Sequence, residues 1–329
     1  MVSAPRKILA FCGTLVLLAA LFFWAVNTGS LQASPEQLLS GLFVSYDETV
    51  ATIYDLRFPR IFIAIVGGAA TAVSGVLLQA AIRNPLADPG LIGINAGASF
   101  AAVLVTALFP ALLFATPLFA FAGGMVAFLL VYGLSWRGGL SPLRIILVGV
   151  AVSALFSGLM DAFFEGSGAS GSASSLVNAS ITLKTWDDLW VILTYGLLGF
   201  AAALLLGRRC DLLALQDKTA RSLGVDVDVN RMLVSAVAVL LASVSTAIIG
   251  PISFLGLIAP HIARLIVGSS HGSLIPYAAL VGAVLLLLAD TIGRTVAAPY
   301  EISAAVIMAI IGGPAFILLL RKARDSYGQ

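Results

Sequence analysis

Four carboxylates near long apolar runs are the side chains best placed for chemistry in this chain: Asp161, Glu165, Asp290 and Glu301. An ion-coupled transporter needs such groups, because an intramembrane carboxylate can carry a proton or a cation. All four fall toward the ends of their runs and not at the centres. Their position therefore favours the mouth of a pathway, or a helix end, over a coupling site.

The sequence contains none of the short motifs that carry enzymatic chemistry. It has no G-x-x-x-x-G-K-[ST] phosphate loop, HExxH pair, CxxC pair or nucleophile elbow. His261 and His271 are interpreted as structural, and Cys12 and Cys210 show no spacing typical of a disulfide or metal site. We expect no catalytic residue, metal or cofactor in this chain, so any ATP and Mg²⁺ must be bound by a separate ATPase subunit.

The composition indicates a membrane protein. Of the 329 residues, 60% are hydrophobic and 10% are charged, whereas roughly a quarter are charged in soluble domains. The mean hydropathy is +1.06, and a soluble core could not hide so much apolar surface. Ten apolar segments are expected to span a bilayer, at about residues 8–26, 58–82, 91–109, 114–135, 143–164, 188–207, 232–249, 253–267, 275–293 and 302–320.

Two of these segments need comment. Arg6 and Lys7 precede the run 8–26, as they would in a signal peptide, but its length of about 19 residues suits a span and no small-x-small cleavage site follows. We expect a retained first helix. The run 253–267 is short and flanked by Gly and Pro, which predicts a broken or tilted helix.

The lysines and arginines orient the spans. If the N-terminus is cytoplasmic, fourteen of the 18 fall on the cytoplasmic side and four fall outside: Arg57, Arg60, Lys184 and Arg294. This is a strong positive-inside bias. We therefore predict an all-α polytopic protein of about ten transmembrane helices, with both termini cytoplasmic and residues 1–329 forming a single transmembrane domain.

The inner loop at about 208–231 predicts a contact with another protein. Apolar residues of the stretch 211–224 fall near one helical face, charges occupy the rest, and Gly224 suits a helix C-terminus. Such a helix could dock in a groove on a cytosolic partner or lie on the membrane surface. The mixture of charge signs favours the partner.

Three other features admit a structural and a functional interpretation. Arg57, Arg60 and Arg294 are either interface anchors or a docking surface for an acidic partner. The interruption 83–90 contains Pro85 and Pro89, and its Asn84 and Asp88 could cap the next helix. The polar stretch 166–180 is a linker or the lip of a pore. The stripe of Gly67, Thr71 and Gly75 is interpreted as helix packing.

Taken together, these segments resemble the FecCD-type permease family of ABC importers, which carry iron-siderophores, haem and cobalamin. The matching runs appear in family order at residues 56–60 (LRFPR), 74–79 (SGVLLQ), 83–89 (RNPLADP), 91–94 (LIGI), 222–224 (SLG), 250–264 (GPISFLGLIAPHIAR), 289–291 (ADT) with Arg294, and 312–316 (GGPAF). The runs at 83–89 and 250–264 are long and specific.

The resemblance implies a type II ABC importer permease fold in the bacterial cytoplasmic membrane. It implies a second permease subunit, two cytosolic ATPase subunits and an extracytoplasmic binding protein as partners, and no nucleic acid. Docking of the binding protein is expected at Arg57, Arg60 and Arg294, and a pathway mouth at Asp161, Glu165 and Asn178. Coupling to the ATPase is expected at Leu212, Leu215, Gln216, Asp217, Lys218, Ala220, Arg221, Leu223 and Gly224.

The chain departs from the family pattern in two places. Gln216 stands where many members carry Gly, and residues 175–180 (SLVNAS) replace a common Gly-Ser-Leu run near the outer path. Family frequency favours a ferric siderophore as the ligand, with haem or cobalamin as alternatives. An ion-coupled secondary transporter, or a membrane scaffold that transports nothing, is the alternative from another class.

Overall fold

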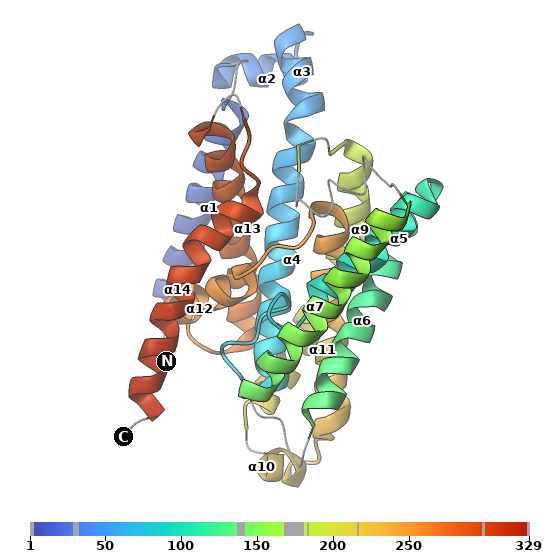
Figure 1. Ribbon diagram of the computed structural model, residues 1–329. Coiled ribbons are helices and arrows are strands. Elements are labelled where there is room, and N and C mark those ends of the chain that lie inside the picture. The colour runs from blue at the N-terminus through green and yellow to red at the C-terminus, as the bar shows by residue number, and fades with distance from the viewer. Residues whose placement is uncertain are drawn as a thin grey trace.

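The computed structural model describes residues 3–28, 33–136, 142–167, 181–182, 184–215, 217–297 and 300–327. Across these ranges the regular structure is helical and no strand occurs. Figure 1 shows the long helices side by side, with α2 (Pro35–Phe43) and α3 (Glu48–Leu56) at one end and α10 (Asp217–Ser222) at the other. The start of α1 (Ala4–Val26) and the end of α14 (Ala304–Tyr327) lie toward the α10 end.

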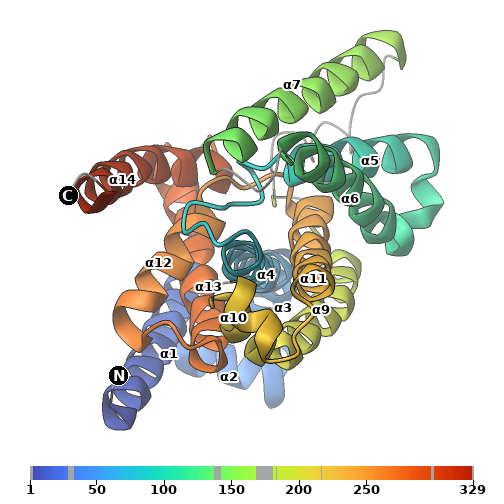
Figure 2. The same ribbon diagram turned by 90° about the horizontal axis from the view of Figure 1, so that it is seen from below.

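The helix α4 (Phe58–Ile82) occupies the centre of the bundle. It begins with Pro59 in its first turn, where the missing N–H has no helical partner to lose, and it ends at Arg83, which has a left-handed backbone (φ 54°). It packs against α13 (His271–Val296), α11 (Val227–Ile249), α9 (Trp186–Leu213) and α12 (Leu255–Val267). Seen from below, these helices surround α4 (Figure 2).

Glycines allow α4 to approach its neighbours closely. A Cβ added at Gly75 would lie 1.9 Å from the carbonyl oxygen of Gly256 in α12, and one added at Gly68 would lie 2.4 Å from that of Gly282 in α13. Backbones can meet at this distance only where side chains are absent. This contact confirms the interpretation of the small-residue stripe as helix packing.

Alanine at Gly75 is therefore expected to destabilise the bundle by about 1–3 kcal/mol, because overpacking forces the backbones apart. Gly133 in α6 (Thr116–Ser135) is the matched control, since an added Cβ there meets nothing within 4 Å. Thermal unfolding of the two purified variants in the same detergent measures the difference. Equal melting temperatures for Gly75→Ala and Gly133→Ala would contradict the packing argument.

The ten expected spans each coincide with an apolar helix. In the described ranges seven helical stretches are long and apolar enough to cross a membrane, and three shorter apolar helices accompany them, at Ile94–Leu108 (α5), Leu255–Val267 (α12) and Ala304–Leu318 in α14. The short segment near 253–267 is α12, which contains Pro260 and is preceded by Phe254 in a left-handed conformation (φ 66°). The helix α1 packs on α13, where Thr14 and Tyr277 share a hydrogen bond of 2.9 Å.

The segment 27–57, which lies between the first two expected spans, contains the two helices α2 and α3. Ser34 caps α2 by accepting from the Gln37 N–H, and Asp47 caps α3 by accepting from the Val50 N–H. Both are good N-cap residues, so the signals for these helices are present in the sequence. Arg57 is the single residue between α3 and α4.

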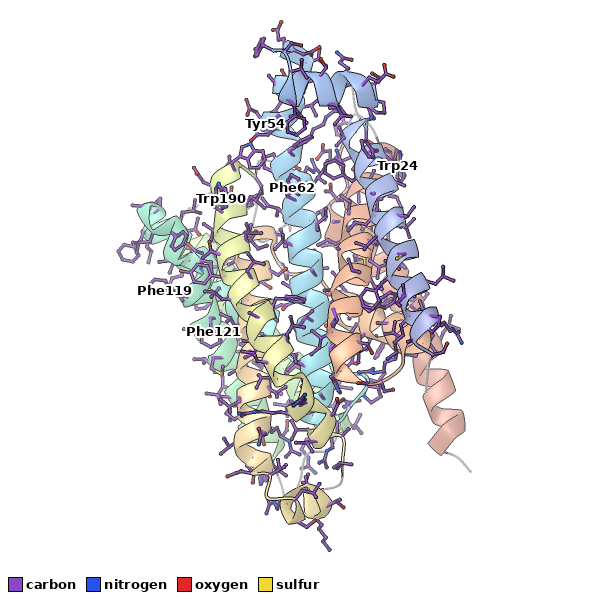
Figure 3. All side chains as sticks on the ribbon, turned by 180° about the vertical axis from the view of Figure 1, so that it is seen from behind. Trp24, Tyr54, Phe62, Phe119, Phe121 and Trp190 are labelled. Carbon is purple, nitrogen blue, oxygen red and sulfur yellow. The ribbon has the colours of Figure 1, made fainter. Side chains whose placement is uncertain are left out.

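The outside of the bundle is apolar, as lipid contact requires. Side chains such as Leu15 and Val16 of α1, and Leu147 and Val150 of α7 (Pro142–Ser167), are exposed. Trp24 and Trp190 lie toward the α2–α3 end in Figure 3 and are also exposed. Aromatic rings at this level are typical of a membrane–water interface. A 3₁₀ helix, η1 (Pro110–Ala115), lies directly before α6.

Candidate functional site

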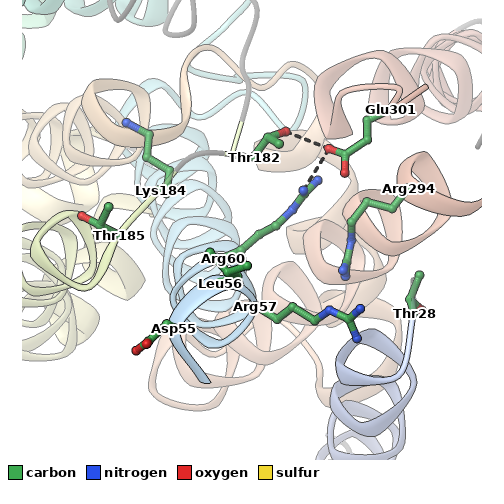
Figure 4. A pocket seen from close by; sticks show the side chains of 10 residues that line it. All are labelled: Thr28, Asp55, Leu56, Arg57, Arg60, Thr182, Lys184, Thr185, Arg294 and Glu301. Atoms are coloured by element: carbon green, nitrogen blue, oxygen red, sulfur yellow. Dashed lines mark hydrogen bonds and ion pairs between the residues drawn. The ribbon is translucent and has the colours of Figure 1, made fainter. Parts of the chain in front are cut away.

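All four cations assigned to the outer face line one cavity of about 550 Å³ near the junction of α3 and α4. Figure 4 shows the cavity, whose lining comprises Thr28, Asp55, Leu56, Arg57, Arg60, Thr182, Lys184, Thr185, Arg294 and Glu301. The residues come from segments far apart in the sequence. The helices α3, α4 and α13, the start of α9 and the segment before α14 all contribute to its wall.

Arg60 is the centre of an ion network behind this cavity. Its Nη2 lies 2.9 Å from Asp290 Oδ1, and its Nη1 lies 2.9 Å from Glu301 Oε2. Asp290 also faces Arg294, whose Nε lies 3.3 Å from Asp290 Oδ2. Arg60 and Asp290 are 7% and 2% exposed. The network ties α4 to α13 and to the segment before α14.

The other charged residues stand around the rim. Arg57 is half-buried and donates from Nη1 to the Val26 carbonyl at the end of α1. Lys184 lies 3.3 Å from Asp188 in the first turn of α9. Partial burial acts to raise the pKa of Glu301, but the Arg60 guanidinium and the Thr182 hydroxyl outweigh it and hold that pKa below its usual value.

The docking role of Arg57, Arg60 and Arg294 stays a prediction, but their surroundings differ from those of a simple surface patch. Arg60 and Arg294 are engaged inside the chain, and only Arg57 stands near the rim. Lys184 was not included among the expected docking residues, although it belongs to the same charge minority. The distribution of lysines and arginines between the two sides of the membrane already predicts that Lys184 lies outside, unlike the other lysines.

The expected pathway residues lie elsewhere. Asp161 and Glu165 are exposed near the C-terminal end of α7, and Figure 2 shows α7 at the edge of the bundle. Asn178, with most of the stretch 166–180, lies outside the described residues. The structure therefore does not bring Asp161 and Glu165 to the cavity lined by Arg60.

The interruption after α4 is partly buried, with Asn84 and the stretch 87–89 buried and Arg83 and Pro85 exposed. Asp88 is 0% exposed and accepts from the Gly90 and Leu91 N–H groups, while Asn84 accepts from that of Leu86. These groups belong to the loop, so the expectation that Asn84 and Asp88 cap the helix α5 is wrong. Because Pro85 and Pro89 have no N–H, the chain turns before α5 begins.

The same interruption packs against the segment that joins α11 and α12. Gln79 Nε2 donates to the carbonyls of Ala87 and Gly256, and Asn95 Nδ2 donates to that of Ile252. A Cβ added at Gly256 would lie 2.9 Å from Asp88 Oδ2 and 2.9 Å from Pro89 Cδ, so the two longest matching runs, 83–89 and 250–264, are in contact. Their specificity has a structural reason, since the backbone at Gly256 packs directly against Asp88 and Pro89 and leaves no space for a larger side chain.

At the inner end the expected helix over 211–224 is two helices. The helix α9 continues to Leu213, the chain turns at Ala214 and Leu215, and α10 begins at Asp217. The break arises where Arg83 Nε donates to the Leu213 carbonyl and so satisfies the end of α9. Gln216 lies outside the described residues.

The remaining coupling residues divide by exposure. Lys218, Arg221 and Gly224 are exposed, as are Leu215 and Leu223, while Leu212 is half-buried and Ala220 is buried. Gly224 has φ 77°, and the Val225 N–H donates to the Ala220 carbonyl beside it. This is the helix C-terminus expected at Gly224. Exposed leucines beside charges are suited to a protein contact.

Two ion pairs hold α10, and a hydrogen-bonded pair, Asp211 with His271, links the neighbouring helices α9 and α13. Asp217 Oδ1 lies 2.6 Å from Arg83 Nη2 and 3.5 Å from Arg231 Nη2. Asp211 in the last turn of α9 lies 2.6 Å from the Nδ1 of His271, and it accepts from the N–H of the same residue. His271 therefore joins α9 to α13, which agrees with its interpretation as structural.

The chain is similar to known proteins over almost its whole length. Residues 17–322 match the model of the FecCD transport family. The chain belongs to the FecCD transport family. The probable haem-iron transport system permease protein IsdF of Staphylococcus aureus is 38% identical over 324 residues, which cover 98% of each chain. The resemblance seen in the motifs is thereby confirmed.

Two solved structures share the fold. A structure described as an inward-facing, metal-chelate-type ABC transporter is 31% identical, covers 96% of this chain and 99% of its own, and has a TM-score of 0.78. PsaBC from Streptococcus pneumoniae, in complex with Fab, is 18% identical over 87% of this chain and 95% of its own, with a TM-score of 0.57, and shows the fold alone. This family member is a multi-pass membrane protein and the permease component of an ABC-type importer, so it is a transport subunit and not an enzyme.

Proposed function

We propose that the chain carries an iron chelate inward across the bacterial cytoplasmic membrane, with haem as the favoured substrate. The observation that carries the proposal is the 38% identity, over 98% of both chains, to a relative named as a probable haem-iron permease. The ferric siderophore expected from family frequency is the second candidate, and cobalamin is the third. The motifs do not separate the three, because none of them holds a chelate-specific group.

The outer cavity is the proposed docking place of an extracytoplasmic binding protein. Its lining holds four cations against the carboxylates of Asp55 and Glu301, and Asp290 and Asp188 pair with Arg60, Arg294 and Lys184. The proposed attraction for acidic side chains is therefore strongest at the rim, beside Arg57. Such complementarity raises the association rate and fixes orientation.

At the opposite end, α10 is the proposed contact of two cytosolic ATPase subunits that bind ATP and Mg²⁺. The exposed side chains of Leu223 (62%) and Leu215 (38%) offer apolar contact beside Lys218 and Arg221. With α10 and both termini on the cytoplasmic side, the positive-inside bias is satisfied.

A second permease subunit is proposed to cover the face of α7. Asp161 and Glu165 are exposed on this membrane-spanning helix, and carboxylates facing lipid are costly. A water-filled path between two copies, or between two related chains, removes that cost. Alternating access then consists of movements of the helices around this path, driven by ATP binding and hydrolysis below.

Reconstituted transport tests the proposal. We expect proteoliposomes that contain this chain, its ATPase subunit and its binding protein to accumulate haemin only when ATP is present on the ATPase side. A ferric siderophore and cobalamin, offered in parallel, separate the three substrates. Omission of the ATPase subunit is the control, and haemin uptake that persists without it would contradict an ATP-driven importer.

The ion-coupled alternative has less support. In the described spanning helices every carboxylate lies within the first or last two turns, as Asp161 and Asp290 do. A secondary transporter is expected to hold a functional carboxylate near the midplane.

A further inference from the structure

Asp217, the first residue of α10, is held by arginines from two other parts of the chain. Its Oδ1 lies 2.6 Å from Arg83 Nη2 and 3.5 Å from Arg231 Nη2. The Arg231 side chain is 9% exposed and that of Arg83 is 29% exposed, while Asp217 retains 47%. The single carboxylate of Asp217 is shared by two guanidiniums, so α10 cannot leave this position without separating both ion pairs.

Both arginines also bind the inner end of α4. Arg83 is the residue at which α4 ends, and Arg231 Nε donates to the carbonyl of Ala81 in its last turn, at 2.9 Å. Carbonyls at a helix C-terminus lack helical partners and attract cations. Asp217 is therefore connected to the end of α4 by two separate side chains. Figure 2 shows α10 beside the lower end of α4.

The other end of α4 carries Arg60 and the outer ion network. With a rise of about 1.5 Å per residue, Arg60 and Arg83 lie about 35 Å apart along one uninterrupted helix. Its backbone packs closely on α13 at Gly68 and on α12 at Gly75. A displacement of the inner end is thus carried to Arg60, and through it to Asp290 and Glu301.

We propose that Asp217 is a positioning residue that joins α10 to α4 through Arg83 and Arg231, and that α4 transmits the movement of α10 to the outer cavity. This inference rests on the proposed function and adds the internal connection between its two ends. Asp217 acts within the chain and does not act by contact with the ATPase. The neighbouring pair of Arg221 and Asp228, at 2.9 Å, is exposed on both sides and reaches only from α10 to α11.

The test compares Asp217→Asn with Asp228→Asn in the assembled importer. Both substitutions keep the side-chain shape and remove one carboxylate from an ion pair. A fluorophore on Leu56→Cys, in a Cys12→Ser background, reports on the outer cavity, because Leu56 lines it and is 65% exposed whereas Cys210 is 0% exposed. Four readouts are followed: co-purification of the ATPase subunits, basal ATP hydrolysis, the response of the Leu56 label to ATP, and haemin uptake.

We expect Asp217→Asn to lose the ATP response at Leu56 and to lower uptake by about tenfold while the ATPase subunits remain bound. Asp228→Asn should resemble the wild type in all four, and Asp217→Glu should restore part of the response. A wild-type response at Leu56 in Asp217→Asn overturns the proposal, as does loss of the ATPase subunits, which would make Asp217 a docking residue. The label at position 56 reports the response to ATP without a transported substrate. A wild-type protein that responds to ATP but takes up no haemin would therefore contradict only the proposal that haem is the substrate.

Discussion

Replacement of Arg60 by methionine is expected to destabilise the protein by about 3–5 kcal/mol, because it leaves a buried carboxylate without its main partner. Asp290 is 2% exposed and would keep only Arg294, at 3.3 Å. Glu301 would also lose the guanidinium at 2.9 Å. Equilibrium unfolding of the purified subunit in mixed micelles measures the change, and we expect a low yield of folded protein at 37 °C.

Two variants make this result specific. Arg221→Met removes an arginine from an ion pair of the same length, 2.9 Å, that is exposed at the inner end, so its expected cost is at most about 1 kcal/mol. Arg60→Met combined with Asp290→Leu removes the central buried pair together. Because Arg294 loses its carboxylate and keeps the Ala25 carbonyl, we expect the double variant to recover part of the loss. If Arg60→Met costs no more than Arg221→Met, or if the double variant recovers nothing, the network is not the stabilising unit described above.

Much of this molecule could be predicted from the pattern of apolar and charged residues. Apolar runs of bilayer length leave little freedom, because every backbone polar group in lipid must be satisfied within a helix. The ten runs accordingly became ten helices. The count of lysines and arginines also selected Arg57, Arg60, Lys184 and Arg294 as a set, and the structure brings this set to one cavity.

The partners of these charges could not be predicted, because they depend on which helices pack together. Arg60 and Asp290 are 230 positions apart and meet only through the contact between α4 and α13. Arg231 and Ala81 are similarly brought together by α11 and α4. The break before α10 was missed for a related reason. Its cause is the long-range hydrogen bond of Arg83, and the apolar spacing of 211–224 alone is compatible with one helix.

Neutralisation of the rim of the outer cavity is expected to slow binding-protein docking without harming the fold. Reversal of the charge at Arg60 would break the buried ion network and would therefore test stability and not docking. The double variant Arg57→Gln with Lys184→Gln is the better choice. Glutamine at position 57 keeps an N–H donor on a shorter side chain, and the loss of the Lys184–Asp188 pair at the start of α9 costs little. We expect the association rate at low salt to fall by about tenfold or more, because steering depends on the local charge.

Asp55→Asn is the control of opposite sign in the same cavity. Asp55 is exposed and contributes a negative charge to the lining, so its neutralisation should accelerate docking of an acidic partner. Both effects should shrink as ionic strength rises, since the screening length falls from about 10 Å at 0.1 M salt to about 3 Å at 1 M. Association rates measured with the subunit in nanodiscs decide the matter. If the two substitutions change the rate in the same direction, or if salt leaves their difference unchanged, the binding protein does not recognise this cavity by charge, and the arginines serve only the ion network behind it.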